Sequence, residues 1–370
     1  MKNLHLMPMC THLDDGMVFA INANFPLEEN IFYHPAQRVP LREVENSFVV
    51  PEAFSVDYIN ENAKKYKRII LHSLFLSSNE IIKLTDEAAK KIVWIVWGHD
   101  LYSVYKKKAL SLNYIVGESI HCVKKVLRGT YIRQFKARRE VSRKVSLFQC
   151  IGIGYPYDEK MIRKKYGQKP TVVYGPVFSN NILSTKKREL RAKHLSCKST
   201  VINILIGHSG FEFIEHEKYL QKLSKYKNEN IHVYLVLAYG ASEERIQKLR
   251  QLSDELFSSG QVTIITEMMK KEIYMEFLST IDIAIFPFLH QSALSNTKSL
   301  AYMGAKMFFH PNGVLAKGFK EGGVKTFDCR KIGKISFSTF IKYDKIPNES
   351  ALLFSDSYDK CVTAWKKILS

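Results

Sequence analysis

The sequence has no long apolar stretch and no patterned set of cysteines. None of its hydrophobic runs reaches the roughly 18–20 residues that a membrane-spanning helix needs. The longest, at 92–97 and 233–238, have the length of buried strands. Residues 1–5 are not followed by the apolar core and small-residue cleavage site of a signal peptide. The six cysteines include no Cys-x-x-Cys pair, so we expect buried free thiols rather than zinc ligands or disulfides. These absences predict a protein that stays in the cytoplasm.

Several motifs of nucleotide and metal chemistry are missing as well. No Gly-x-Gly-x-x-Gly occurs, which argues against a dinucleotide cofactor, and no Gly-x-x-x-x-Gly-Lys-Ser/Thr occurs, which argues against a P-loop nucleotidase. No Asp-x-Asp pair is present to clamp a diphosphate through a metal. We therefore expect no cofactor and no metal. The negative charge of a leaving group would then be stabilised by helix N-termini and by a cation such as Lys298 or Lys317.

Apolar residues and positive charge are both plentiful. The chain has 370 residues, 46% of them hydrophobic, with 22 Phe and 19 Tyr, which indicates a folded protein long enough for two domains. Of the net charge of +19, about half lies in residues 106–144, where twelve basic residues face two acidic ones. That segment has three interpretations: a solvated helical face, docking on anionic lipid headgroups, or nucleic-acid binding. No helix-turn-helix, zinc finger or RNA-recognition motif accompanies it, so nucleic acid is not expected.

Short apolar strands alternate with amphipathic helices in both halves, which predicts parallel sheets covered on both faces. In the first half we expect strands at 2–7, 68–72, 92–97 and 146–150 and helices at 56–66 and 79–90, the latter capped by Ser78 or Asn79. The second half is more regular, with strands at 201–206, 231–238, 262–265, 282–286 and 306–310 and helices between them. The sequence therefore predicts two doubly wound, Rossmann-like α/β domains facing a cleft, residues 1–175 and 176–370, the second carrying a C-terminal helix at 357–369.

Ligands of open α/β sheets bind outside the carboxyl ends of the strands, so polar residues there are candidates. The turn Gly207-His208-Ser209-Gly210 follows the first strand of the second half, and its glycines let the backbone approach a ligand closely. The loop at 290–297 precedes a helix whose N-terminus suits a pyrophosphate. Its donors are Ser292, Ser295, Asn296 and Thr297, with Lys298 next to them. Ser295 could instead simply cap the helix.

The first half offers a second group of candidates at the ends of two strands. Gly98 permits a sharp exit after Trp97, so that His99 and Asp100 point toward the cleft. Asp100 suits sugar hydroxyls or proton acceptance, and His99 titrates near neutrality. A helix N-cap is the alternative for Asp100. His72, at the end of its own strand, is either a substrate contact or a structural histidine.

These segments resemble a known family of sugar transferases. The resemblance lies in residues 71–75, 97–102, 206–210 and 282–304, which are similar to the TDP-N-acetylfucosamine:lipid II N-acetylfucosaminyltransferases, glycosyltransferase family 56. It implies a GT-B type fold, a metal-independent and retaining reaction, and a peripheral location on the inner face of the cytoplasmic membrane. It also implies a dTDP-sugar donor and an undecaprenyl-diphosphate-linked saccharide acceptor.

Within that frame we expect Asp100 and His99 to serve catalysis, and the other candidates to bind substrate, namely Gly98, His72, Gly207, His208, Ser209, Gly210, Ser292, Ser295, Asn296, Thr297 and Lys298. Residues 106–144 would face an anionic membrane surface. Three alternatives stay open: another GT-B transferase with a soluble acceptor, a sugar-nucleotide epimerase, and a basic nucleic-acid-binding protein. The expected pathway is cell-surface polysaccharide synthesis, as enterobacterial common antigen or O-antigen.

Overall fold

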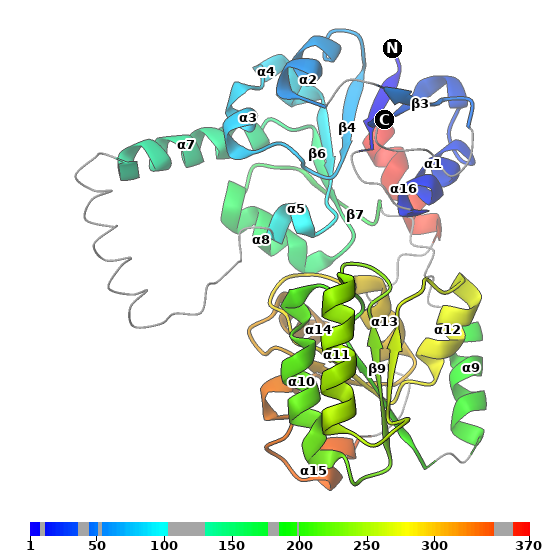
Figure 1. Ribbon diagram of the computed structural model, residues 1–370. Helices are drawn as coiled ribbons and strands as arrows, with labels where there is room; N and C mark the ends of the chain where they lie inside the picture. Colours follow the sequence, from blue (N-terminus) through cyan, green and yellow to red (C-terminus); the bar gives the residue numbers. More distant parts are fainter. Residues whose placement is uncertain are drawn as a thin grey trace. The chain divides into compact units, whose positions relative to one another are not determined.

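The chain divides into two compact units. The computed structural model describes residues 1–7, 12–35, 44–50, 54–102, 130–176, 185–197, 200–343 and 358–370. Unit 1 is made of Met1–Asn180 and Asp356–Ser370, and unit 2 of Asn181–Ser355. Each contains one parallel sheet flanked by helices (Figure 1). The first unit thus takes residues from both ends of the chain, which the expected division at 175/176 did not include.

Unit 1 is built on a seven-stranded sheet of order β3-β2-β1-β4-β5-β6-β7. Every neighbouring pair is parallel. The strands are β1 (Asn3–Leu6), β2 (Asn30–Pro35), β3 (Ser47–Val50), β4 (Arg68–His72), β5 (Ile92–Ile95), β6 (Cys150–Ile153) and β7 (Val172–Tyr174). β1, β4, β5 and β6 are buried along their whole length, which suits a sheet covered on both faces. The strand expected at 146–150 begins at Cys150, because residues 146–149 turn out of the preceding helix.

Most helices of unit 1 are short, and three of them, at Val56–Asn62, Ser78–Lys83 and Asp86–Lys91, begin at a side-chain cap. They are α1 (His12–Asn22), α2 (Val56–Asn62), α3 (Ser78–Lys83), α4 (Asp86–Lys91), α5 (His99–Tyr102), α7 (Thr130–Val145), α8 (Pro156–Tyr166) and α16 (Tyr358–Leu369). The single helix expected at 79–90 is two, because Leu84 leaves the helical conformation and Thr85 caps a new start. Ser77, rather than Ser78 or Asn79, caps α3, in a capping box with Glu80.

Unit 2 has a six-stranded parallel sheet of order β10-β9-β8-β11-β12-β13. Its strands are β8 (Ile202–Ile206), β9 (Ile231–Val236), β10 (Val262–Ile265), β11 (Ile283–Phe286), β12 (Lys306–Phe309) and β13 (Phe327–Asp328). Its helices are α9 (Thr185–Ser196), α10 (His216–Leu223), α11 (Glu243–Leu256), α12 (Lys271–Ser279), α13 (Leu294–Tyr302), α14 (Val314–Glu321) and α15 (Phe337–Ile341). The alternation predicted for the second half is confirmed, and both units are doubly wound α/β layers.

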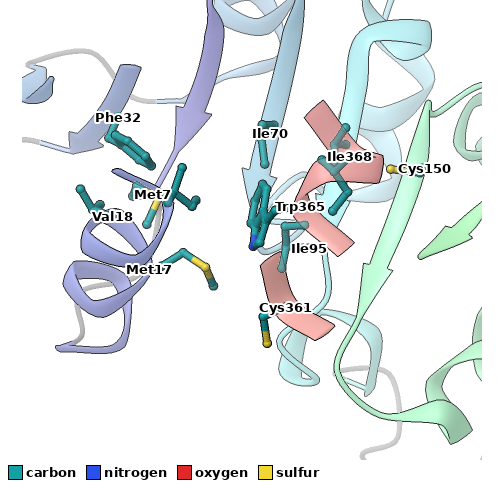
Figure 2. Packing of buried hydrophobic residues seen from close by; sticks show 12 residues of the cluster. Met7, Met17, Val18, Phe32, Ile70, Ile95, Cys150, Cys361, Trp365 and Ile368 are labelled. Carbon is teal, nitrogen blue, oxygen red and sulfur yellow. The ribbon is translucent and has the colours of Figure 1, made fainter. Parts of the chain in front are cut away.

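The C-terminal helix α16 belongs to unit 1, so its expected place in the second domain was wrong. Figure 2 shows Trp365 of α16 beside Ile70 and Ile95 of the sheet, and Cys361 and Ile368 of the same helix belong to this buried cluster. The Trp365 side chain is fully buried, and its indole Nε1 donates to the carbonyl of Pro176 at 2.7 Å. An amphipathic helix packs wherever an apolar surface is uncovered, and only the fold decides which surface that is.

The cysteines and the helix hydrophobicity bear on two of the expectations from the sequence. Cys150, Cys329 and Cys361 are buried free thiols as predicted, whereas the free thiol of Cys197 is exposed. Within the described residues, no helix has an apolar stretch long enough to cross a bilayer.

Candidate functional site

The best-formed group of candidate residues lies in unit 2 at the point where the strand order reverses. β8 and β11 are neighbours there, although three helices and two strands separate them in sequence. Parallel strands end at the same edge, so the loop after β8 and the loop after β11 meet. Such switch points are where open α/β sheets bind ligands.

Both glycines of the loop after β8 are required by close packing. Gly207 has φ +68, and a Cβ on it would lie 2.4 Å from a methyl carbon of Ile214. A Cβ on Gly210 would lie 2.3 Å from the Cβ of Ala241, because the Gly210 amide donates to the carbonyl of Tyr239 at 2.7 Å. The space on the Cβ side is therefore filled by protein: Gly207 packs against Ile214 of the same connection, and Gly210 fits the β8 loop against the β9 loop.

The loop after β11 leads into α13 without a side-chain cap. Ala293 occupies the N-cap position at φ +55, in the left-handed region, and makes no capping hydrogen bond. The first amides of a helix lack intrahelical acceptors, so an uncapped start is attractive to an anion. Ser295 lies inside the helix, where its carbonyl accepts from Ser299 Oγ, so the alternative that it caps α13 is excluded.

His208 and Ser292 join the two loops. His208 Nε2 and Ser292 Oγ are 3.1 Å apart. The His208 side chain is only 6% exposed, and its other ring nitrogen, Nδ1, has no hydrogen-bond partner among the described residues. Burial, aided by the neighbouring His290, lowers the pKa of His208 to about 4, so the ring is neutral at pH 7. The buried amide oxygen Oε1 of Gln291 also lacks a partner within the described chain. A neutral His208 ring protonated on Nδ1 could donate to an anion beside this helix N-terminus, whereas the Gln291 oxygen is an acceptor and suits a hydroxyl or amide donor.

The other predicted residues of unit 2 are buried or hydrogen-bonded within the protein. Asn296 donates to the hydroxyl of Tyr274 at 2.9 Å, and Thr297 Oγ1 donates to the carbonyl of Leu294 at 2.9 Å. Thr297 and Lys298 are buried within α13. Ser209 is fully buried, and its hydroxyl has no hydrogen-bond partner among the described residues. Of the predicted polar side chains, the structure thus brings His208 and Ser292 into direct contact.

Sequence reasoning missed a group of rings around His208. This ring cluster comprises Phe211, Phe213, Tyr239, Phe288 and His290, from the loops after β8, β9 and β11. The His208 ring lies 5.8–6.5 Å from those of Phe213, Tyr239 and Phe288. The available signal was Phe211-Glu212-Phe213 directly after a glycine turn, where aromatic side chains are not needed to form a helix or a strand.

In unit 1, Asp100 is committed to the fold. Its carboxylate accepts from Trp94 Nε1 at 2.7 Å and from the amides of Leu74, Leu101 and Trp97 at 3.0, 3.0 and 3.2 Å. These bonds tie the loop after β4 to the loop after β5. A carboxylate engaged in this way is not free to accept a substrate proton, so the geometry favours a bracing role over the catalytic one that we expected.

The remaining candidates of unit 1 surround this brace. Gly98 has φ +94, which permits the sharp exit predicted after Trp97. His99 begins α5, and its side chain lies outside the described part of the structure. His72 is fully buried, with its ring 6.0 Å from that of Trp365 and its Nε2 3.0 Å from His5 Nδ1, which supports the structural interpretation. The two candidate groups belong to different units, and the cleft expected between them stays a prediction.

The basic segment is described in part. Residues 103–129 lie outside the described residues, and α7 covers the rest. Arg143 and Lys144 pair with Asp86 of α4. Lys136, Arg138 and Arg139 are exposed, and the ring of Phe135 beside them is 69% exposed. Helical spacing puts Phe135, Arg138 and Arg139 on one side of α7.

Comparison with known proteins identifies the class. The family model described as 4-alpha-L-fucosyltransferase, glycosyl transferase group 56, matches residues 130–327. A glycosyltransferase from Rickettsia africae ESF-5 is similar in structure, with TM-score 0.58 and 12% identity over 100% of this chain and 97% of that one.

Two further solved structures have the same fold. WaaG, a glycosyltransferase involved in lipopolysaccharide biosynthesis, has TM-score 0.57 and 10% identity over 99% of this chain and 98% of that one. Anabaena Alr3699/HepE, in complex with UDP-glucose, has TM-score 0.57 and 12% identity over 100% of this chain and 99% of that one. The fold expected from the sequence is confirmed as the GT-B glycosyltransferase type.

Proposed function

Because the chain belongs to the 4-alpha-L-fucosyltransferase family, glycosyl transferase group 56, and is a glycosyltransferase, we propose what it transfers and to what. The donor is a dTDP-linked deoxy-amino sugar of the N-acetylfucosamine type. The acceptor is an undecaprenyl-diphosphate-linked glycan of cell-surface polysaccharide synthesis, either enterobacterial common antigen or O-antigen. The reaction retains the anomeric configuration and needs no metal.

The observation that carries the donor site is the contact between His208 and Ser292 beside the uncapped start of α13. Parallel strands bring these residues together at the switch point of unit 2. Backbone amides there, with the Ser292 hydroxyl, would hold the diphosphate. The complex of Alr3699/HepE with UDP-glucose supports a nucleotide-sugar donor for this fold.

The chemistry follows from where charge develops. The bond between the anomeric carbon and the donor phosphate oxygen breaks as the acceptor hydroxyl oxygen attacks from the same face, through an oxocarbenium-like transition state. The hydroxyl proton passes to the leaving diphosphate. The leaving diphosphate gains negative charge, and preorganised donors at the start of α13 stabilise it. With Asp100 engaged as a brace, no nucleophilic carboxylate is assigned to the reaction.

The acceptor proposal rests on the exposed side of α7. Its cations and Phe135 suit an anionic lipid surface, because each cation near such a surface contributes about 1 kcal/mol. A peripheral position on the inner face of the cytoplasmic membrane would bring the enzyme to a lipid-linked acceptor.

A donor screen tests the proposal directly. The full chain is incubated with dTDP-, UDP- and GDP-linked sugars, with and without undecaprenyl-diphosphate-linked saccharides, in the presence of EDTA. We expect transfer from a dTDP-sugar only when the lipid-linked acceptor is present, with retention in the product by NMR. Conversion of the donor without any acceptor would instead indicate an epimerase, and loss of transfer in EDTA would contradict metal independence.

A further inference from the structure

Three rings of the ring cluster face solvent although folding would favour their burial. Phe211, Phe213 and Tyr239 are 43%, 36% and 46% exposed. We call them the outer rings. Phe211 and Phe213 stack with centroids 5.5 Å apart and planes 18° apart, and Tyr239 meets Phe211 edge-on at 6.0 Å. Contiguous exposed apolar surface on a folded protein marks a binding site.

The loops are built to hold these rings in place. Gly240 has φ +78, and a Cβ on it would lie 2.8 Å from the Phe211 ring, so the ring packs directly over bare backbone. The hydrogen bond from the Gly210 amide to the Tyr239 carbonyl fastens the β8 loop to the β9 loop beneath the rings. Phe213 is fixed from the other side by His290, 4.4 Å away between centroids. The outer rings therefore form a preorganised face rather than loose side chains.

We propose that the outer rings form the face on which the base of the donor's nucleoside diphosphate stacks. The inference rests on the proposed function, because it places the diphosphate at Ser292 and α13. His208 contacts Ser292, Phe213 lies next to His208, and Phe211 lies next to Phe213. The transferred sugar is bonded directly to the diphosphate, whereas the base is separated from it by the ribose. Rings two or three contacts away from Ser292 thus suit the base better than the sugar.

Charge argues for the same occupant. Glu212 lies between the two phenylalanines and is exposed, whereas Glu215 at the start of α10 is paired with Lys218. The Glu212 carboxylate, which has no ion-pair partner within the described residues, would disfavour an anionic lipid surface. A nucleobase carries no charge and stacks on aromatic faces regardless of its identity.

The test separates base binding from phosphate binding. Affinities of the full chain for dTDP, UDP and GDP, and for inorganic pyrophosphate, are measured by calorimetry for the wild type, F211A, F213A, F211L and F213L. The leucine variants keep apolar volume and lose the aromatic face. I273A, which trims an exposed apolar side chain on α12, is the matched control. Thermal unfolding confirms that each variant is folded.

We expect the alanine and leucine variants to bind the preferred nucleotide about tenfold or more weakly, with pyrophosphate affinity and I273A unchanged. Equal loss for nucleotide and pyrophosphate would overturn the proposal, since the rings would then only support the phosphate loop. Unchanged nucleotide affinity would overturn it too. Absence of nucleotide binding in the wild type would instead refute the donor site of the proposed function.

Discussion

At the scale of single residues, Asp100 shows how a motif acquires its meaning from its surroundings. Its segment is distinctive in sequence, and an aspartate after a strand end suggests chemistry. The structure instead surrounds the carboxylate with one indole and three amide donors. Buried donors that lose a charged acceptor are expensive, because they cannot return to water.

We therefore expect D100A to lower the free energy of unfolding by about 3 kcal/mol. D100N, which keeps the shape and loses the charge, should cost less. Urea unfolding measures both, with D254N at an exposed position of α11 as the control. Full stability of D100A together with lost transfer would restore Asp100 to a catalytic role.

Gly207 makes a second prediction at this scale, with Gly260 as its matched control. Both have positive φ, but a Cβ at Gly260 would meet nothing within 4 Å, whereas one at Gly207 would meet Ile214 at 2.4 Å. G260A should lower the free energy of unfolding by about 1–2 kcal/mol, because only the left-handed backbone conformation is strained by the new side chain. G207A should cost more and weaken nucleotide binding. Equal costs in denaturant unfolding would show that the β8 loop yields to the added methyl group.

At the scale of elements, α16 decides how much of the chain unit 1 requires. The Trp365 ring lies tilted 5.8 Å from that of His5 and stacks 6.0 Å from that of His72, and its indole donates to Pro176 just after β7. His5 and Met7, which alternate with Leu4 and Leu6 along the chain, are fully buried on the sheet face that α16 covers.

Removing the Trp365 side chain should destabilise unit 1 alone. W365A leaves a large cavity and is expected to lower the free energy of unfolding by about 3–5 kcal/mol. Hydrogen exchange should rise across β1, β4 and β5 and stay unchanged across β8 and β11. Loss of protection in unit 2 would contradict the assignment of α16 to unit 1. If W365A does not fold, W365F, which keeps an aromatic ring and removes less volume, allows the same measurement.

The α7 prediction also belongs to this scale. Replacing Lys136, Arg138 and Arg139 by alanine should weaken binding to anionic vesicles by roughly 150-fold, since three cations near the surface contribute about 3 kcal/mol. Co-sedimentation at low and high salt measures it. The triple variant K360A/K366A/K367A on α16 removes equal charge elsewhere. Equal weakening by that control would mean that net charge, rather than α7, directs the protein to lipid.

At the scale of the whole molecule, buried histidines predict acid sensitivity. Burial lowers the pKa of His5 and His216 from 6.5 to about 3, and that of His208 to about 4. The unfolded chain binds these protons below pH 6.5 while the folded protein does not, so the stability is present above 6.5 and is lost as pH falls toward 3–4.

At about pH 4.5 each of these histidines should lower the free energy of unfolding by on the order of 2 kcal/mol relative to pH 7. Urea unfolding at pH 7 and at this acidic pH gives the difference. H216L, which removes one titrating ring from the start of α10, should flatten the pH dependence. An unchanged slope in H216L would show that carboxylates, and not the buried histidines, govern the loss.

Much of the architecture follows from local pattern. The apolar runs of β8, β9, β11 and β12 with helical segments between them permit one arrangement, a parallel layer, because a right-handed crossover is the stable way to connect such strands. The residues at Gly207 and His208 and at Ser292 could be picked out for the same reason, since strand ends of a parallel sheet share one edge. Family membership was readable from short segments at those ends.

The tertiary structure decided what could not be read from neighbours in sequence. Trp365 of α16 lies in unit 1 because the uncovered apolar surface is there, 189 residues away from its hydrogen-bond partner Pro176. Asp100 became a brace because Trp94 and Leu74 present donors to it. The ring cluster exists only because three loops meet at one sheet edge. Sequence periodicity fixes which residues are buried and in what kind of element, whereas long-range packing selects each side chain's partners, and those partners determine its chemistry.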